Sequence, residues 1–153
     1  MLNDVLGFPE SASVPNVATV TQTSNEMGMT SSLTPPGKTA HGLSYSAIGE
    51  LTQYTPPLAS ASAPPGQCAA GAECYQYNVD RQLEDVTLGD GSVVDYAYHS
   101  TKGLLTSVNV PVSGITTFGY STVGRLQTIT APDHGVLTYN TQGELPIRET
   151  WSG

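Results

Sequence analysis

One short pattern recurs along the chain and constrains its fold more than any other feature. An apolar residue, any residue and a tyrosine are followed by a leucine six positions after the tyrosine. The pattern occurs five times and includes five of the eight tyrosines. Recurrence at a fixed internal spacing indicates an array of structural repeats. The Tyr–Leu pairs, which we expect to form the core of each repeat, are Tyr45–Leu51, Tyr77–Leu83, Tyr98–Leu104, Tyr120–Leu126 and Tyr139–Leu145.

Each copy of the pattern predicts a β-hairpin. Residues two apart in a strand point to the same face, so the apolar residue and its tyrosine form a stripe at the end of one strand. A polar turn follows, as at 121–124 and 140–143, and four of the five turns contain glycine near their end, where a bulged loop needs a positive φ. In four copies the next apolar residue does not lie two positions after the leucine. We therefore expect a bulge there, or a leucine that packs beneath the turn.

Further turn sequences at 89–91, 111–114 and 131–135 join the copies into a meander from about residue 75 to residue 150. The predicted fold is all-β: tandem antiparallel β-hairpins that form a curved or spiralling sheet. An ordinary β-sandwich with coinciding tyrosines is the alternative. Four segments are expected: an N-terminal segment 1–27 with an edge-covering strand near 17–21, a diverged repeat 28–57, an Ala/Ser/Pro/Gly-rich loop 58–74 that holds both cysteines, and regular repeats 75–153.

Charge excludes two classes of partner. The net charge is −8, and the five Lys and Arg residues stand singly along the chain. Binding to phosphate backbones or to anionic lipid needs clustered basic residues, so we expect neither nucleic-acid binding nor binding to anionic lipid. No apolar stretch is long enough for a membrane span. The first residues lack the features of a signal peptide, so the signal of a secreted protein would lie upstream of this segment.

The two cysteines, Cys68 and Cys74, are separated by five small or flexible residues. This spacing does not match a zinc site, and a second pair of ligands is missing from the sequence. A disulfide that closes a small loop is favoured over two free thiols. Such a disulfide would place the protein in an oxidising compartment.

Catalytic signatures are missing from the sequence. His41, His99 and His134 are far apart and share no metal-ligand spacing, and nucleophile-elbow, phosphate-loop and zinc-protease motifs do not occur. Four carboxylates fall within one predicted hairpin: Glu84, Asp85, Asp90 and Asp95. We interpret them as surface acids on a solvated face of the sheet and not as the catalytic carboxylate pair of a glycosidase. We expect no enzyme activity, no cofactor and no metal site.

Three fragments resemble the YD repeats of bacterial Rhs proteins, which are similar to repeats in toxin-complex shells and in teneurins. They are 77–83, 120–126 and the Thr34-Pro35-Pro36-Gly37 turn. The resemblance implies a spiralling sheet that forms the wall of a hollow shell. In the family, the shell encloses a C-terminal region, which is released by cleavage at an aspartyl self-cleavage site. The sequence contains no Asp-Pro dipeptide, so that cleavage core is not expected here. The aspartate that follows each family tyrosine is replaced in all five copies, by Ser46, Asn78, His99, Ser121 and Asn140.

Three functions remain open. The leading interpretation is a non-catalytic structural module, a shell wall or spacer, of a large secreted or cell-surface bacterial protein. Its partners would be neighbouring repeats of the parent chain or copies of itself. The second interpretation is a self-assembling extracellular filament built by strand-edge pairing. The third is a carbohydrate-binding or adhesive module that contacts glycans through exposed tyrosines and Trp151.

Overall fold

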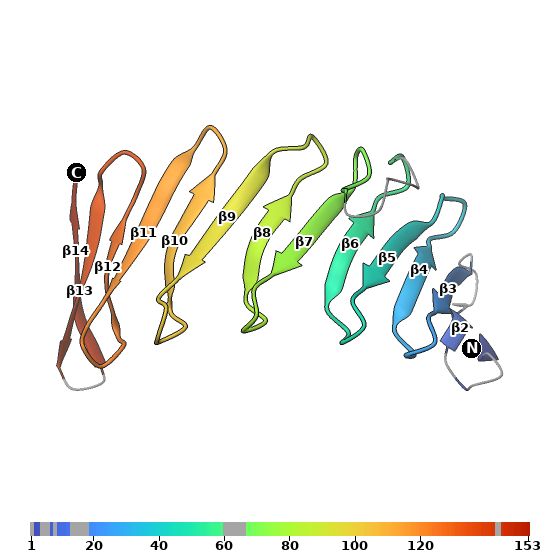
Figure 1. Ribbon diagram of the computed structural model, residues 1–153, viewed down its shortest axis with the longest axis horizontal. Helices are drawn as coiled ribbons and strands as arrows, with labels where there is room; N and C mark the ends of the chain where they lie inside the picture. The colour runs from blue at the N-terminus through green and yellow to red at the C-terminus, as the bar shows by residue number, and fades with distance from the viewer. Residues whose placement is uncertain (1, 4–6, 8, 13–18, 60–66, 143–144) are drawn as a thin grey trace. The chain divides into compact units, whose positions relative to one another are not determined.

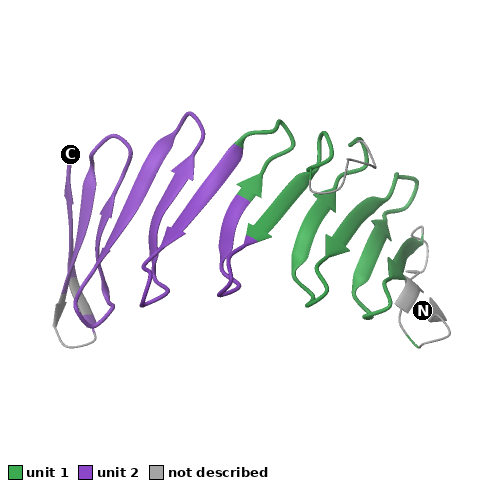
Figure 2. Ribbon diagram, viewed as in Figure 1, with its two compact units in different colours: residues 1–76, 86–92 green, residues 77–85, 93–153 purple. Residues whose placement is uncertain are grey.

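The computed structural model describes residues 2–3, 7, 9–12, 19–59, 67–142 and 145–153. The described residues form β-strands joined by turns, with no helix among them (Figure 1). The chain divides into two compact units (Figure 2). Unit 1 comprises residues 1–76 and 86–92, and unit 2 comprises residues 77–85 and 93–153. The predicted all-β fold of tandem antiparallel hairpins is confirmed in both units.

Unit 1 contains the first strands of the chain, and each of them pairs antiparallel with the strand that follows it in the sequence. Residue 77 of β7 and residues 83–85 of β8 belong to unit 2. The strands are β1 (Leu2–Asn3), β2 (Pro9–Ala12), β3 (Val20–Ser24), β4 (Thr30–Thr34), β5 (His41–Tyr45), β6 (Leu51–Thr55), β7 (Glu73–Tyr77) and the end of β8 (Leu83–Thr87).

Unit 2 contains six further strands, which again pair antiparallel in chain order. Tight turns connect them, so each strand lies beside its sequence neighbour. The strands are β9 (Val93–Tyr98), β10 (Leu105–Val110), β11 (Gly114–Tyr120), β12 (Leu126–Thr130), β13 (Val136–Gln142) and β14 (Leu145–Ser152).

One type of turn recurs in both units. The first residue of the turn bonds through its carbonyl to the N–H three positions on, and through its own N–H to the carbonyl four positions on. The fourth residue has a positive φ, as at Gly49 (86°) and Gly124 (83°). This is the three-residue loop with a bulge that the glycine positions predicted. It begins at Asn25, Ser46, Asn78, Leu88, Ser121 and Ala131.

The expected irregularity after the leucine is a β-bulge. Tyr120 lies opposite Leu126 and Gly119 lies opposite Thr128, so Gln127 is the extra residue on the returning strand. The hairpin of β5 and β6 shows the same shift after Leu51. The bulge moves the next same-face position from the second to the third residue after the leucine. Leu126 therefore shares its face with Ile129.

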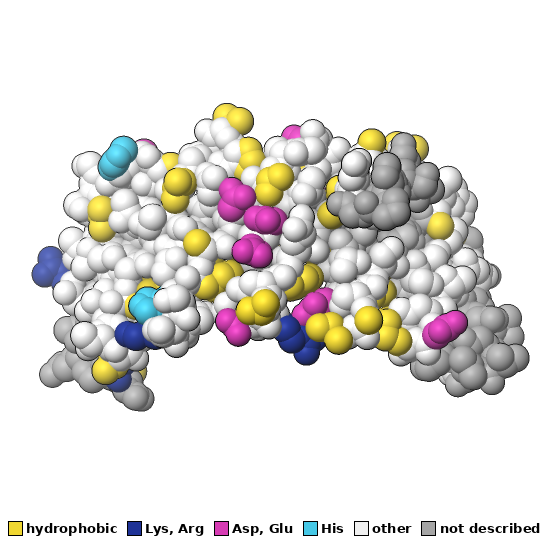
Figure 3. Space-filling view, viewed as in Figure 1, with side chains coloured by type: hydrophobic (Ala, Val, Ile, Leu, Met, Phe, Trp, Pro, Cys, Tyr) yellow, Lys and Arg dark blue, Asp and Glu magenta, His cyan; other side chains and the backbone are white. Residues whose placement is uncertain are grey.

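The pairing register divides unit 2 into a tyrosine face and a threonine face. Residues directly opposite each other in a ladder point to the same side of the sheet. The tyrosine face includes Tyr96, Tyr98, Leu105, Val108, Thr116, Phe118, Tyr120, Leu126, Ile129, Leu137 and Trp151, and the threonine face includes Ser107, Ile115, Thr117, Thr128, Thr130, Val136, Thr138 and Thr150. In the view of Figure 3, hydrophobic and charged side chains are separated by wide areas of backbone and other side chains.

Among the described residues, neither unit has a second layer over its strands, and every contact given between strands joins neighbours in the chain. The only buried apolar residues in the described part of the chain are Ala69, Ala72, Val86 and Val94. Most other strand side chains are half-buried, because they are covered by adjacent strands and not by an opposing sheet. A two-layer sandwich, the alternative fold, is therefore wrong for both units.

Two sequence expectations differ from the structure. The turn expected at 140–143 is wrong for residues 140–142, because β13 continues through Gln142 and Tyr139 lies opposite Glu149. Leu105, not Leu104, lies opposite Tyr98, because the loop after β9 is one residue longer. The strand expected at 17–21 falls partly outside the described residues; Val20 and Thr21 lie in β3.

Candidate functional site

The repeat tyrosines form a set of equivalent hydrogen bonds. The Tyr45 hydroxyl donates to the Thr30 carbonyl at 3.0 Å, and the Tyr98 hydroxyl donates to the Leu83 carbonyl at 2.8 Å. The Tyr120 hydroxyl donates to the Leu105 carbonyl at 2.8 Å. Donor and acceptor are fifteen residues apart in all three cases. We call these bonds the tyrosine ladder.

The acceptors of the tyrosine ladder share one structural position. Thr30, Leu83 and Leu105 are the first residues of β4, β8 and β10. Each tyrosine therefore reaches back from the end of its own strand to the start of the returning strand of the preceding hairpin. A half-buried hydroxyl needs a partner, and the first carbonyl after a turn supplies one. The ladder joins successive hairpins by side chains as well as by strand pairing.

One repeat escaped the sequence search. Ser24 lies opposite Thr30 with the same six-residue spacing as the Tyr–Leu pairs, and Asn25 and Gly28 begin and end the same turn. Serine and threonine replace the tyrosine and the leucine, so the apolar pattern is absent. A search for a polar residue followed three positions later by glycine would have found this copy.

The residues that replace the family aspartate stabilise the turns. The Asn78 amide oxygen accepts bonds from the N–H groups of Asp80 and Gln82, both at 3.0 Å. The Ser121 hydroxyl accepts from the Arg125 N–H at 3.0 Å, and Ser46 acts in the same way. His99 makes a longer contact, 3.3 Å from Nδ1 to the Thr101 N–H. Asn78, Ser46 and Ser121 thus stabilise their turns with uncharged side chains.

Neighbouring turns of unit 2 are also connected. The Gln82 side-chain amide donates to the Gly103 carbonyl at 2.7 Å, and the Lys102 ammonium donates to the Thr122 carbonyl at 3.0 Å. The donor and acceptor lie 21 and 20 residues apart, about one repeat. These bonds satisfy turn carbonyls that the loops leave open.

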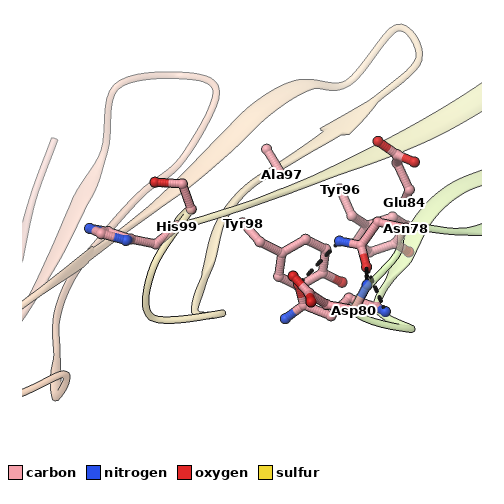
Figure 4. Close-up of a pocket in the computed structure, with 9 residues that line it drawn as sticks. Asn78, Asp80, Glu84, Tyr96, Ala97, Tyr98 and His99 are labelled. Carbon is pink, nitrogen blue, oxygen red and sulfur yellow. Dashed lines mark hydrogen bonds between the residues drawn. The ribbon is translucent and has the colours of Figure 1, made fainter.

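A shallow cavity of about 300 Å³ lies beside these turns in unit 2 (Figure 4). It is lined by Asn78, Asp80, Gln82, Glu84 and residues 96–100. Asn78 is already bonded to the turn backbone. The other polar side chains of the lining, among them Asp80 and Glu84, offer hydrogen-bonding contacts.

The predicted group of carboxylates does meet on one surface of unit 2. Burial raises the pKa of the Asp85 carboxyl, and the charges of Asp95 and Glu84 raise this pKa further. The Asn109 side chain donates to Asp95 at 2.9 Å. In the described part of the chain, three or more His, Cys, Asp or Glu side chains nowhere gather in a way that could hold a metal ion. Asp90 lies in unit 1, where hydrogen bonds from Ser92 lower the pKa of its carboxyl.

The three histidines are separated in the structure. His41 begins β5, and its Nδ1 lies 2.7 Å from the Tyr54 hydroxyl, with the two rings stacked. His99 begins a turn, and His134 occupies a left-handed turn position with φ of 70°. His41 is therefore a half-buried strand residue, whereas His99 and His134 lie in turns.

The structure joins Cys68 and Cys74 in a disulfide, with 5.8 Å between their Cα atoms. The closed loop packs onto a hairpin turn of the same unit. The Gly71 N–H donates to the Gly89 carbonyl at 3.1 Å, and Ala69 and Ala72 in the loop are buried. The disulfide thus holds the inserted loop against the turn that follows β8.

The geometry defines a class of protein, a β-hairpin repeat array with one layer of strands in each unit. The sequence matches no family model and no curated protein. Among solved structures, the fold is similar to chains of TcdB2-TccC3-Cdc42 (TM-score 0.62, 17% identity, 81% of this chain), TcdB2-TccC3-TEV (0.60, 17%, 80%) and TcdB2-TccC3 (0.56, 17%, 86%). This chain spans 6% of the length of those chains. At this identity the likeness shows a common fold.

Within the described residues, no helix is long and apolar enough to cross a membrane.

Proposed function

We propose that this chain is a non-catalytic structural module of the YD/Rhs type, which serves as shell wall or spacer in a large secreted or cell-surface bacterial protein. The tyrosine ladder is the observation that carries the proposal. Its three bonds each link a hairpin to the preceding one through a backbone carbonyl, and that linkage does not depend on any ligand. The likeness in fold to TcdB2-TccC3 chains supports the same conclusion.

The packing supports an extensible wall. Because strands contact only their chain neighbours, the stability of the array is the sum of hairpin terms and nearest-neighbour terms. Such an array lengthens by adding hairpins without redesign of a central core. A wall or spacer needs this property, whereas an enzyme needs a fixed constellation around a cleft.

An extracellular or cell-surface location is part of the proposal. The disulfide between Cys68 and Cys74 fits an oxidising compartment. A low content of charged residues (12%) and many Thr and Ser residues also fit a role in which the wall remains chemically inert.

A direct test combines an activity screen with native-state hydrogen exchange on the same protein. We expect no turnover of polysaccharide, peptide or ester substrates. We also expect that Tyr98→Phe lowers the protection of amides in the hairpins on both sides of β9, because the ladder couples them. A turnover that disappears with one Asp or Glu substitution would reject the structural role. Protection lost only within the hairpin of β9 and β10 would reject the wall made of coupled hairpins.

A filament subunit is the second candidate, and β14 favours it. β14 pairs only with β13, so its outer edge is available for another strand. Trp151 on this strand is 62% exposed. Electron microscopy at several protein concentrations tests this role: filaments that lengthen with concentration would support it, and their absence would leave the wall or spacer.

A glycan-binding role has one supporting feature, the exposed Trp151, whose ring lies over Gly135. A Cβ atom at Gly135 would come within 2.8 Å of the indole. Because 62% of Trp151 is exposed, its indole is accessible for stacking on a sugar ring. Titration of the protein with polysaccharides, followed by Trp fluorescence, distinguishes this role from the two structural ones.

A further inference from the structure

Two turns of unit 1 begin with the same three residues. Thr34-Pro35-Pro36 starts at the last residue of β4, and Thr55-Pro56-Pro57 starts at the last residue of β6. Equivalent hydrogen bonds close the two turns: the Lys38 N–H donates to the Pro35 carbonyl at 3.1 Å, and the Ala59 N–H donates to the Pro56 carbonyl at 3.0 Å. Both turns lie on the same side of unit 1 (Figure 1). We call them the first and the second proline turn.

The two proline turns differ in the residue that precedes the closing N–H. This residue is Gly37 in the first turn, with φ of 64°, and Leu58 in the second. The Leu58 side chain is 98% exposed, so it gains almost no burial when the chain folds. A single exposed leucine is common on protein surfaces. What distinguishes Leu58 is that it lines a cavity.

This cavity, of about 480 Å³, lies beside the two proline turns. Gly42 lies opposite Thr55 in the ladder between β5 and β6, which places the first residue of β5 next to the second proline turn. The volume lies within the range of small-molecule sites, about 300–1,000 Å³. One side of the lining is apolar and comes from the second proline turn. The lining residues are Lys38, Thr39, His41, Pro56, Pro57 and Leu58.

The lining is held in place before any ligand arrives. The φ angle of each proline is fixed by its ring, so Pro56 and Pro57 form a stiff wall. The His41 ring is stacked on the Tyr54 ring, with 5.9 Å between their centroids, and the His41 Nδ1 lies 2.7 Å from the Tyr54 hydroxyl. A site that is formed in advance loses little conformational entropy on binding.

The polar groups of the lining favour an anion. The lining contains a lysine but neither Asp nor Glu, and in the part of the chain that the structure describes no acidic side chain pairs with Lys38. The Thr39 hydroxyl can donate a hydrogen bond. In the tautomer of neutral His41 that accepts from Tyr54 through Nδ1, the ring proton lies on Nε2, which is a further donor. An ammonium with neutral donors beside it suits a carboxylate.

We propose that this cavity binds a small organic carboxylate with an apolar body, that is, an aliphatic or aromatic carboxylic acid. The carboxylate accepts hydrogen bonds from Lys38 and Thr39, and the apolar body packs against Pro56, Pro57 and Leu58. This site adds a ligand to the wall or spacer role. It is separate from the tyrosine ladder and from Trp151.

A free acid is favoured over the C-terminus of a peptide. β5 pairs with both β4 and β6, and β6 pairs with both β5 and β7. A peptide backbone that entered beside the cavity would therefore find no strand edge with which to pair. A small molecule needs only the side chains of the lining.

NMR titration of the full chain with matched probes tests the two halves of the site. Benzoate and octanoate carry both a carboxylate and an apolar body, whereas benzamide has the ring without the charge and acetate has the charge without the ring. We expect benzoate and octanoate to bind at one site, and benzamide and acetate to bind about tenfold or more weakly. The amides that shift should be those of Lys38, Thr39, His41 and Leu58.

Substitutions assign the site. Lys38→Met retains an apolar stem and removes the charge, so it should weaken benzoate binding by about tenfold. Lys102→Met in unit 2 is its control and should leave binding unchanged. Leu58→Ala should weaken benzoate binding severalfold, whereas Val112→Ala, at an exposed turn residue of unit 2, should not. Circular dichroism of each variant checks that the fold is retained.

Several results would overturn the proposal. They are failure of both benzoate and octanoate to bind, benzamide binding as tight as that of benzoate, and equal effects of Lys38→Met and Lys102→Met. A peptide that ends in an apolar residue with a free carboxylate is the rival ligand. If it shifts the same amides while benzoate does not, the site takes a chain terminus and not a small acid. None of these results bears on the wall or spacer role, which depends on the tyrosine ladder.

Discussion

The Tyr98 hydroxyl and the Leu83 carbonyl are 2.8 Å apart although fifteen residues of chain separate them. This bond ties the end of β9 to the start of β8. Burial, followed by the nearby Tyr96, raises the pKa of the Tyr98 phenol, which therefore remains a donor throughout the physiological range. The same relationship at Tyr45 and Tyr120 makes this bond the characteristic contact of the array.

Tyr98→Phe should lower the free energy of unfolding by about 1–2 kcal/mol, since it removes the hydroxyl and leaves the Leu83 carbonyl without that donor. Urea denaturation followed by circular dichroism measures the change. Tyr96→Phe, two positions away on the same strand, is the matched control. If the two variants lose equal stability, the ladder bond contributes nothing specific.

Gly124→Val should destabilise the protein by about 2 kcal/mol, because Gly124 has a φ of 83° and a β-branched residue is strained there. Ser121→Ala in the same turn removes only one hydrogen bond from the Arg125 N–H, and about 1 kcal/mol or less is expected. Thermal melting of both variants gives the comparison. Equal melting midpoints would contradict the assigned turn.

Val112→Gly should raise the stability of the protein. Val112 is a β-branched residue with φ of 67° on an exposed turn, so its replacement relieves strain and removes no buried contact. A gain of about 1 kcal/mol is expected after the added flexibility of glycine in the unfolded chain is subtracted. Val110→Gly, at the end of the adjacent strand β10, should have the opposite sign. Chemical denaturation of the two variants provides the test.

Reduction of the Cys68–Cys74 disulfide should release the inserted loop. The intact protein should be about 2 Da lighter than its reduced form by mass spectrometry. Reduction should lower stability by about 2 kcal/mol, the value expected for a short closed loop, and should expose Ala69 and Ala72 to exchange. Unchanged exchange of amides 69–72 and 89 in reduced protein would show that the loop packs without the disulfide.

The raised pKa of Asp85 predicts a pH dependence of defined sign. The folded protein retains a proton on this carboxyl at pH values where the unfolded chain has lost it. This group therefore favours folding less as pH rises from about 4 through its folded pKa. Asp85→Asn should stabilise the protein at neutral pH and flatten that part of the profile. Asp90, whose pKa is lowered, contributes with the opposite sign, so Asp90→Asn is a suitable comparison.

The sequence predicted the hairpins well because turn chemistry and tyrosine spacing are local. The glycine at position 124 and the polar cap at 121 specify their turn without help from distant residues. The prediction from sequence failed where the register of a strand depends on the strand beside it. The longer loop after β9 makes Leu105 the partner of Tyr98, and the pairing of β13 with β14 continues to Gln142. Both outcomes depend on which residues pair between neighbouring strands, and the spacing of residues along the sequence does not specify that pairing.

The bonds of the tyrosine ladder all run backwards, from a later hairpin to an earlier one. A ribosome or a secretion channel delivers the chain from its N-terminus, so each tyrosine emerges after the carbonyl that accepts its bond. Each hairpin can therefore form its ladder bond as soon as it has been delivered, because the preceding hairpin that supplies the acceptor carbonyl is already in place. Because the contacts are local in sequence, the array should assemble quickly and in order. The direction of the ladder makes it suited to folding during synthesis.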